Sequence, residues 1–300
     1  MELLTGDNDS GRRLDRILRK ALPDHPLPLI HRLLRQGQVL VDGKPGKAQD
    51  RIDSGVRILI VGKKLTPRRQ DAKNAKNDLG QKLEILWEGT GLIAVNKPVG
   101  ISVHGPDSLD TVVRSYLADK LPPSLSFKPG PLHRLDKPSS GIVIFSTSID
   151  GARLFTSLMR ELKIKKTYLA VIEGSLKKDE IWQDELIRDK EKKKTFITHE
   201  KSINSKNAIT KVKPLAKSGG FTLIKAEIVT GRTHQIRAQA AAHGYPLAKD
   251  IKYGGHKGDF FLHAWKLEFL NYSIEAPIPL AQTGCFKDYF KQKSYLQTCE

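Results

Sequence analysis

The sequence has little that would support redox chemistry or a metal site. Only two cysteines occur in its 300 residues, Cys285 and Cys299, and both lie near the carboxyl end without the paired spacing of a zinc site. No glycine-rich pattern of the kind that cradles nucleotide phosphates is present. We therefore expect neither a disulfide framework, nor a metal, nor a cofactor.

Long hydrophobic runs and acidic residues are also scarce. No apolar run approaches the roughly 20 residues of a membrane-spanning helix, and the amino terminus "MELLTGDNDSGRR" lacks the layout of a signal peptide. The expected location is the cytoplasm, with no membrane partner. Against 51 Lys and Arg there are 33 Asp and Glu, a formal net charge of +18. Such an excess favours a polyanionic partner, nucleic acid before an anionic membrane surface.

The chain is long enough for two domains. Residues 1–62 predict a small α/β module. In it, residues 12–22 and 28–37 have the apolar spacing of amphipathic helices, and "QVLVDGKPG" and "GVRILIV" read as strands. Residues 63–82 carry seven basic groups and too few apolar residues for a core, which predicts a basic linker. Residues 83–300 then form the second domain.

Basic helix faces are usually just solvated surface, but two of them followed by "GQVLVDGK" resemble the alpha-L RNA-binding motif. The resemblance implies phosphate contacts that position RNA without reading its sequence. The candidate residues are Arg12, Arg13, Arg32, Arg35 and Lys44.

In the second domain short apolar runs separated by turns predict mostly strands, with helices near residues 110–121, 151–162 and 233–244. The expected fold class is α+β, with a large mixed, mainly antiparallel sheet flanked by helices.

Within this domain, "HRLDKPSSGIVIF" places Asp136 beside an arginine and ahead of a run that reads as a buried strand. An Asp in such a loop commonly caps a turn. A carboxylate held on a rigid element beside a cation can also serve as a nucleophile. The residues of this stretch leave both interpretations open.

The wider pattern resembles the RluA-type pseudouridine synthases. "HRLDKPSSGIVIF" is preceded by "IAVNKPVGISVH" and followed by "KKTYLAVIEG", "TGRTHQIRAQAAAHGYPLAKDIKYGG" and "FFLHAWKLEF", in the family's order. The resemblance implies an enzyme that detaches uracil from its ribose in RNA, turns it and rejoins it through a ring carbon. Because no atom is gained or lost, neither cofactor nor metal is required.

The resemblance assigns catalytic work to Asp136, Tyr168 and Arg237. The carboxylate of Asp136 would attack the substrate or abstract a ribose proton, and both routes stay open. Tyr168 would stack on the uracil, since a phenol is a weak base at neutral pH; packing is its ordinary alternative. Arg237 would pair with Asp136, orient it and keep it anionic; otherwise it is an exposed helical arginine.

The resemblance also implies which residues of this domain contact RNA. Arg134 would enter the stack as the target base leaves it, or else pair with a nearby acid. Arg232, Thr233 and His234 stand before a helix, a position suited to a phosphate, although His234 could be buried. His133 completes this RNA-binding set.

Two positions depart from the family's usual pattern. Ala248-Lys249-Asp250 has a lysine where glycine is usual, which could alter RNA contacts at the pocket rim, and Pro138-Ser139 differs from the commonest aspartate motif.

The stretch "GRRLDRILRKAL…LIHRLLRQGQVLVDGK" resembles members that act on 23S large-subunit ribosomal RNA, so ribosomal RNA is the expected substrate and partner. A tRNA substrate and a catalytically inert, RNA-binding ribosome assembly factor are the alternatives. A nuclease using His133 and Asp136 as metal ligands is a weaker one. On family grounds we expect a monomer.

Overall fold

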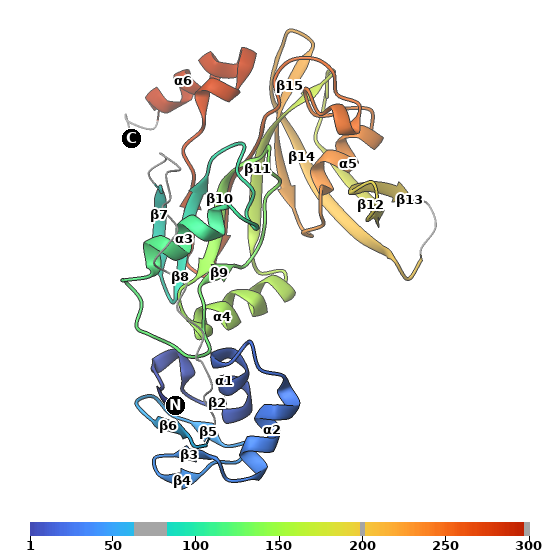
Figure 1. Ribbon diagram of the computed structural model, residues 1–300. Helices are drawn as coiled ribbons and strands as arrows, with labels where there is room; N and C mark the ends of the chain where they lie inside the picture. Colours follow the sequence, from blue (N-terminus) through green and yellow to red (C-terminus); the bar gives the residue numbers. More distant parts are fainter. Residues whose placement is uncertain (63–82, 199–201, 297–300) are drawn as a thin grey trace.

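The computed structural model describes residues 1–62, 83–198 and 202–296. The predicted basic linker at 63–82 and Cys299 lie outside these residues. A small amino-terminal module, blue in Figure 1, sits at one end of a larger domain built on a long sheet. Within the described ranges, every helix is too short or too polar to pass through a lipid bilayer.

The amino-terminal module packs two helices on a small sheet. Helices α1 (Leu14–Ala21) and α2 (Leu27–Arg35) bury one apolar face each, as their spacing predicts. The sheet has the order β1 (Glu2–Leu4), β6 (Arg57–Ile60), β3 (Val39–Val41), β4 (Lys44–Pro45). Strands β2 (Arg12–Arg13) and β5 (Arg51–Ile52) form a separate pair.

The larger domain contains one sheet of 11 strands. They are β7 (Ile85–Gly89), β8 (Leu92–Lys97), β9 (Gly130–Pro131), β10 (Ser140–Ser146), β11 (Lys165–Glu173), β12 (Glu180–Asp189), β13 (Lys194–Thr198), β14 (Ser205–Ser218), β15 (Phe221–Ile228), β16 (Leu262–Phe269) and β17 (Tyr272–Glu275). The main path runs β13-β12-β14-β15-β11-β16-β10-β8-β7, with β17 beside β16 and β9 beside β10. Its pairings are antiparallel except β10 with β16. The predicted mixed, mainly antiparallel sheet is confirmed.

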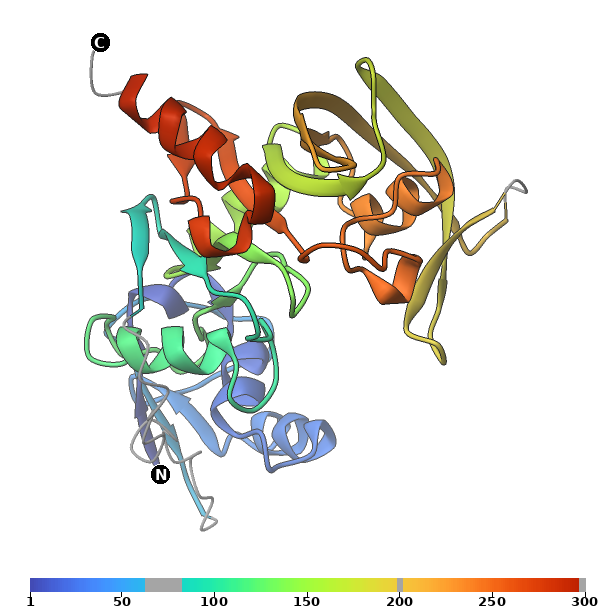
Figure 2. The ribbon, with the colours of Figure 1, turned by 90° about the horizontal axis from the view of Figure 1, so that it is seen from above.

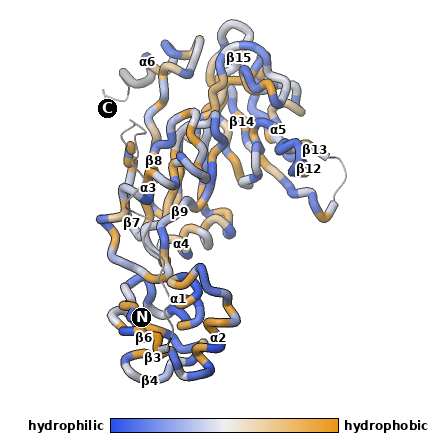
Figure 3. Tube along the Cα trace, viewed as in Figure 1, coloured by the Kyte–Doolittle hydropathy of each residue, from blue (hydrophilic) through white to orange (hydrophobic). Residues whose placement is uncertain are grey.

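Four helices flank the sheet (Figures 1 and 2): α3 (Leu109–Leu117), α4 (Ile149–Arg160), α5 (Gln235–Ala242) and α6 (Lys287–Leu296). Helices α3 and α5 share one apolar cluster with the central strands, whereas α4 packs into another. Hydrophobic residues gather along the central strands (Figure 3). Three of these helices lie where the sequence predicts them, and α6 was not predicted.

The parallel junction between β10 and β16 requires a glycine. Gly141 pairs with Ala264 and has a φ of +108°, in the region that favours glycine. A Cβ on Gly141 would lie 2.3 Å from the Ala264 carbonyl oxygen. The glycine that ends the "HRLDKPSSG" motif is therefore explained by close backbone approach.

A buried lysine supports the loop that precedes β10. The Lys97 ammonium donates to the carbonyl oxygens of Pro98 at 2.8 Å, Ile101 at 2.7 Å and Lys137 at 3.4 Å. Burial lowers the pKa of Lys97 to about 8, although the nearby charge of Asp136 opposes this shift. Lys97 thus ties the turn after β8 to the loop that carries Asp136.

Candidate active site

Asp136 and Arg237 meet in an ion pair. Arg237 Nη1 donates to Asp136 Oδ2 at 2.8 Å, and the two side chains are 8% and 15% exposed respectively. Arg237 lies in helix α5 and Asp136 in the loop before β10, and the two are 101 positions apart in the sequence. The structure therefore brings together the pair that the sequence resemblance predicts.

Arg237 is held from its other side by Asp250. Arg237 Nε and Nη2 each donate to one oxygen of Asp250 at 2.8 Å, the two-pronged geometry that suits a guanidinium. Burial alone would lower the pKa of Arg237, but the bonds from Asp250 and Asp136 outweigh it and raise that pKa. Arg237 is a permanent cation fixed between two carboxylates.

Tyr168 lies on the same cavity as this ion pair. Strand β11 has an irregularity in its register against β16 between Thr167 and Tyr168, a device that re-aims a side chain. Burial, and then the charge of Asp136, raise the pKa of the Tyr168 hydroxyl. The phenol is therefore protonated near pH 7, a state that does not suit a general base.

Two cavities meet at Asp136. One has a volume of about 280 Å³ and the other about 60 Å³. The residues that line both are Arg134, Leu135, Asp136, His234 and Arg237. Arg134 is exposed and forms no ion pair with any residue that the structure describes. Its side chain is open to solvent and lines both cavities.

His234 lies inside the pocket, against Asp136. Its Nε2 is 3.5 Å from Asp136 Oδ1, and its Nδ1 is 2.7 Å from the Tyr253 hydroxyl. Burial lowers the pKa of His234 to about 4. The charge of Asp136 opposes this shift, and the charges of neighbouring cations, Arg237 first, add to it. His234 is therefore neutral near pH 7, and the structure places it beside the carboxylate.

The other histidine of the predicted RNA-binding set faces the core. His133 Nε2 accepts a hydrogen bond from the Ile144 amide at 3.0 Å, and its ring stacks on Phe155 of α4. Burial, and then the charge of Lys166, lower the pKa of His133 to about 3. The His133 imidazole therefore contacts residues of the protein interior, and it lines neither cavity.

Arg232 and Thr233 are exposed before α5, as predicted. Arg232 Nε donates to the Asn207 carbonyl at 3.1 Å and its side chain lines the smaller cavity. The Thr233 carbonyl accepts from Thr195 Oγ1.

The five cations of the amino-terminal module that were predicted to contact RNA divide into two groups. Arg12 donates to Ser126 of the larger domain, and Arg13 pairs with Asp15 at 2.7 Å. The remaining three are exposed and have no ion pair within the described part of the chain: Arg32, Arg35 and Lys44.

Lys249 adopts the backbone conformation of the glycine it replaces. Its φ is +54°, its side chain is exposed, and its ammonium is 3.7 Å from Asp259. The neighbouring Asp250 is buried against Arg237. Of the residues that shape this site, Asp250, Lys97 and Tyr253 were not assigned a role from sequence. Lys97 donates to backbone carbonyl oxygens, Asp250 contacts Arg237 and Tyr253 contacts His234. The spacing of these residues in the sequence does not reveal these contacts.

Among residues 1–62, 83–198 and 202–296, no group of three or more His, Cys, Asp or Glu side chains is arranged to hold a metal ion. The exposed Cys285 is a free thiol.

The two parts of the chain match two different known protein families. Residues 91–242 match the family described as RNA pseudouridylate synthase, and residues 12–58 match the S4 domain. The chain belongs to the RNA pseudouridylate synthase family. This pseudouridine synthase is an isomerase, and its S4 domain is an RNA-binding module, as the resemblance predicted.

Relatives of this pseudouridine synthase align over almost its whole length. The "Ribosomal large subunit pseudouridine synthase C" of Vibrio vulnificus is 29% identical and covers 93% of this chain and 92% of its own. The "Ribosomal large subunit pseudouridine synthase D" of Neisseria meningitidis serogroup B is 30% identical, covering 90% and 76%. The human protein "RNA Pseudouridylate Synthase Domain Containing 1" shares the fold with a TM-score of 0.57 at 20% identity, covering 66% of this chain and 84% of its own.

Proposed function

We propose that this pseudouridine synthase modifies specific uridines of 23S large-subunit ribosomal RNA, as a monomer in the cytoplasm. Relatives whose names specify the large ribosomal subunit align with 90% or more of the chain, the S4 domain included. The net charge of +18 suits a long polyanionic substrate. We also propose the domain boundaries 1–62, 63–82 and 83–300 for the S4 module, linker and catalytic domain.

In the proposed reaction the target uridine leaves its stack and enters the cavities above Asp136. Loss of stacking costs a few kcal/mol, and Arg134, exposed at the pocket, fills the gap that the base leaves. Tyr168 stacks on the uracil as a neutral phenol. The ring–ribose bond then breaks, the uracil turns, and it rejoins through carbon.

The proposed roles of the ionised groups follow from their contacts. Asp136 acts on the substrate, by covalent attack or by abstraction of a ribose proton. Arg237 is a positioning residue: its bond of 2.8 Å fixes the Asp136 carboxylate, while Asp250 fixes Arg237. His234, neutral beside Asp136, shapes the pocket wall.

The single observation that carries this proposal is the Asp136–Arg237 pair in a cavity shared with Tyr168. Replacing Asp136 by Asn keeps the shape and removes the charge. We expect Asp136→Asn to lower pseudouridine formation in transcribed 23S fragments by at least about a thousandfold. The exposed Asp179→Asn is the matched control and is expected to retain wild-type activity. Equal activity in both variants would contradict the assignment.

The substrate is tested in cells by mapping pseudouridine in total RNA with the gene deleted and restored. We expect sites in 23S RNA to disappear on deletion and to return with wild-type enzyme but not with Asp136→Asn. Loss confined to tRNA would replace the proposed substrate. Unchanged pseudouridine, with a ribosome assembly defect that Asp136→Asn corrects, would identify an assembly factor instead.

A further inference from the structure

The S4 module is locked onto the catalytic domain by a buried carboxylate. Asp9 is fully buried, and its oxygens accept hydrogen bonds from the amides of Leu125 and Ser126 at 2.9 Å and from the Ser124 hydroxyl at 2.9 Å. The Ser126 hydroxyl also donates to Asp9. Burial alone would raise the pKa of Asp9, but its hydrogen bonds, led by the one from the Ser126 hydroxyl, lower it. The carboxylate is therefore ionised and fully satisfied.

Two further contacts restrict the same interface. Asn8 Oδ1 accepts from the Ile149 amide, at the start of α4, at 3.0 Å. Gly6 approaches Pro123 so closely that a Cβ would lie 2.1 Å from its carbonyl oxygen. The module is thus held against both the 123–126 segment and the first turn of α4.

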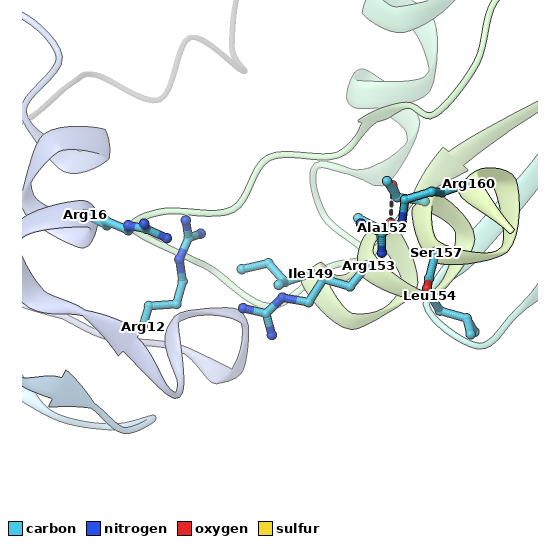
Figure 4. Close-up of a pocket in the computed structure, with 9 residues that line it drawn as sticks. Arg12, Arg16, Ile149, Ala152, Arg153, Leu154, Ser157 and Arg160 are labelled. Carbon is cyan, nitrogen blue, oxygen red and sulfur yellow. Dashed lines mark hydrogen bonds between the residues drawn. The ribbon is translucent and has the colours of Figure 1, made fainter.

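This docking creates a groove between α1 and α4 with a volume of about 780 Å³. Figure 4 shows Arg12 and Arg16 on the side of the module and Arg153 and Arg160 on α4. Among the residues that the structure describes, none that lines the groove is acidic. Helix α4 buries Phe155 on its opposite face, so its arginines remain at the surface.

The positive charge of the groove is largely unbalanced. Within the described residues, neither Arg16 nor Arg160 forms an ion pair, and Arg153 pairs only with Asp150, where both side chains are highly exposed. Such a surface pair contributes little. Burial lowers the pKa of Arg12; Asp9 opposes that shift, and the charges of Arg153 and Arg16 add to it. Cations on the two walls therefore repel one another, and an anion between them would relieve the repulsion.

Helix α4 also contacts the catalytic motif directly. The ring of its Phe155 stacks on His133 with centroids 6.1 Å apart. His133 is immediately followed by Arg134 and lies three residues before Asp136. A polyanion in the groove would therefore lie over the helix that supports the loop bearing the active carboxylate.

We propose that α1 and α4 together form one RNA-backbone-binding groove, in which Arg16, Arg153 and Arg160 contact phosphates flanking the target uridine and the Asp9 contacts fix the distance between the two walls. This inference rests on the proposed function, because it takes RNA as the ligand. It assigns an RNA-binding role to α4, a catalytic-domain helix outside the active-site cavities. RNA is favoured over a membrane because guanidinium groups on two facing walls suit a strand that passes between them.

The test measures binding of a transcribed 23S fragment across a range of salt concentrations. Replacing Arg153 and Arg160 together by Gln should raise Kd roughly tenfold and reduce the slope of log Kd against log salt by about 1 for each lost contact. The matched control, Lys177→Gln with Lys178→Gln, removes two exposed cations from the turn between β11 and β12. It should change neither the affinity nor the slope.

Docking is tested by combining Asp9→Ala with the α4 substitutions. If the two walls act as one groove, the Arg153 and Arg160 substitutions should raise Kd less in the Asp9→Ala background than in the wild type. The effects of the two changes on the binding free energy are then less than additive. Full additivity would contradict the fixed groove. A thermal unfolding curve of Asp9→Ala with the wild-type catalytic-domain transition shows that the variant is folded. If that transition is lost, Gly6→Ala, which disturbs the contact with Pro123 and keeps the Asp9 carboxylate, replaces it in the same cycle.

Failure of the groove and failure of the proposed function give different results. An unchanged salt slope in the α4 variant, with pseudouridine still formed by the wild type, would refute the groove alone. A reduced slope on a fragment that the wild type does not modify would support the groove and contradict the proposed substrate. Weaker binding to phosphatidylglycerol vesicles with unchanged RNA binding would identify a membrane surface and overturn the inference.

Discussion

At the scale of single residues, the site is a row of alternating charges, Asp136–Arg237–Asp250. Arg237 gives one nitrogen to Asp136 and two to Asp250, and Asp250 is only 2% exposed. The orientation of the Asp136 carboxylate therefore depends on a second carboxylate that does not line the cavities.

Replacing Asp250 by Asn should weaken the contact that fixes Arg237 beside Asp136. The buried guanidinium loses one of its two anionic partners, so the free energy of unfolding should fall by about 3 kcal/mol. We expect kcat to fall more than about tenfold with little change in KM, since Asp250 positions the reacting group without touching RNA. Urea unfolding measures the change in stability, and steady-state kinetics measure kcat and KM. Asp259→Asn, in an exposed pair with Lys249, is the control, and a rise in KM alone would contradict the positioning role.

Sequence reasoning singled out candidate residues at motif positions and assigned no role to the residues that contact them. Asp136, Tyr168 and Arg237 stand in recognisable blocks, and the structure brings them together. Asp250 was noted only beside the unusual Lys249, whose positive φ explains why glycine is common there. For His133 the residue type and position gave no measure of burial, which depends on contacts with Ile144 and Phe155.

At the scale of elements, the site depends on a parallel pairing in an otherwise antiparallel sheet. Strands β10 and β16 join through Ser140 and Gly141, and the Ser140 hydroxyl lies 2.9 Å from His263 Nδ1. The loop bearing Asp136 enters the sheet at this junction.

A methyl group on Gly141 should disrupt the junction. Because a Cβ would lie 2.3 Å from the Ala264 oxygen and the φ of +108° is strained for alanine, Gly141→Ala should lower the free energy of unfolding by more than about 3 kcal/mol. Thermal denaturation measures the change. Gly130→Ala, at a position with ordinary φ and 4.0 Å to the nearest atom, should cost less than about 1 kcal/mol. Similar losses in both variants would disprove the steric explanation.

Elements with strong local signals were predictable. The helices α1, α2, α3, α4 and α5 and the strands around Asp136 follow from apolar spacing and turn residues. Helix α6 gave no comparable periodic signal. The order of the strands in the sheet could not be predicted, because β10 pairs with β16 across more than 120 residues.

At the scale of the whole molecule, three histidines are kept neutral by burial. Their pKa values are lowered to about 3 for His133 and about 4 for His234 and His263. Unfolding releases them to titrate near their usual value of about 6.5. Below that pH the unfolded chain binds more protons than the folded one, so stability is lost as pH falls from about 6.5 towards 4.

The loss should reach at most about 1.4 kcal/mol per pH unit for each histidine. Urea unfolding at several pH values measures it. His133→Gln keeps an acceptor for the Ile144 amide but cannot titrate, so its stability should depend less steeply on pH than that of the wild type. The exposed His256→Gln should keep the wild-type dependence. An unaltered pH dependence in His133→Gln would refute the assignment to this residue.

The place of β16 in the sheet has a consequence for synthesis of the enzyme. Strands β7, β8 and β10 form one half of the main path and β11 to β15 the other, and within the described ranges β16 is the strand that joins them. Ribosomes translate from the amino terminus, so both half-sheets emerge before residues 262–269 exist. A nascent chain therefore carries two open edges that only its late-made strand can close. Premature termination would leave both edges exposed to aggregation and proteolysis, and active enzyme arises only from nearly complete chains.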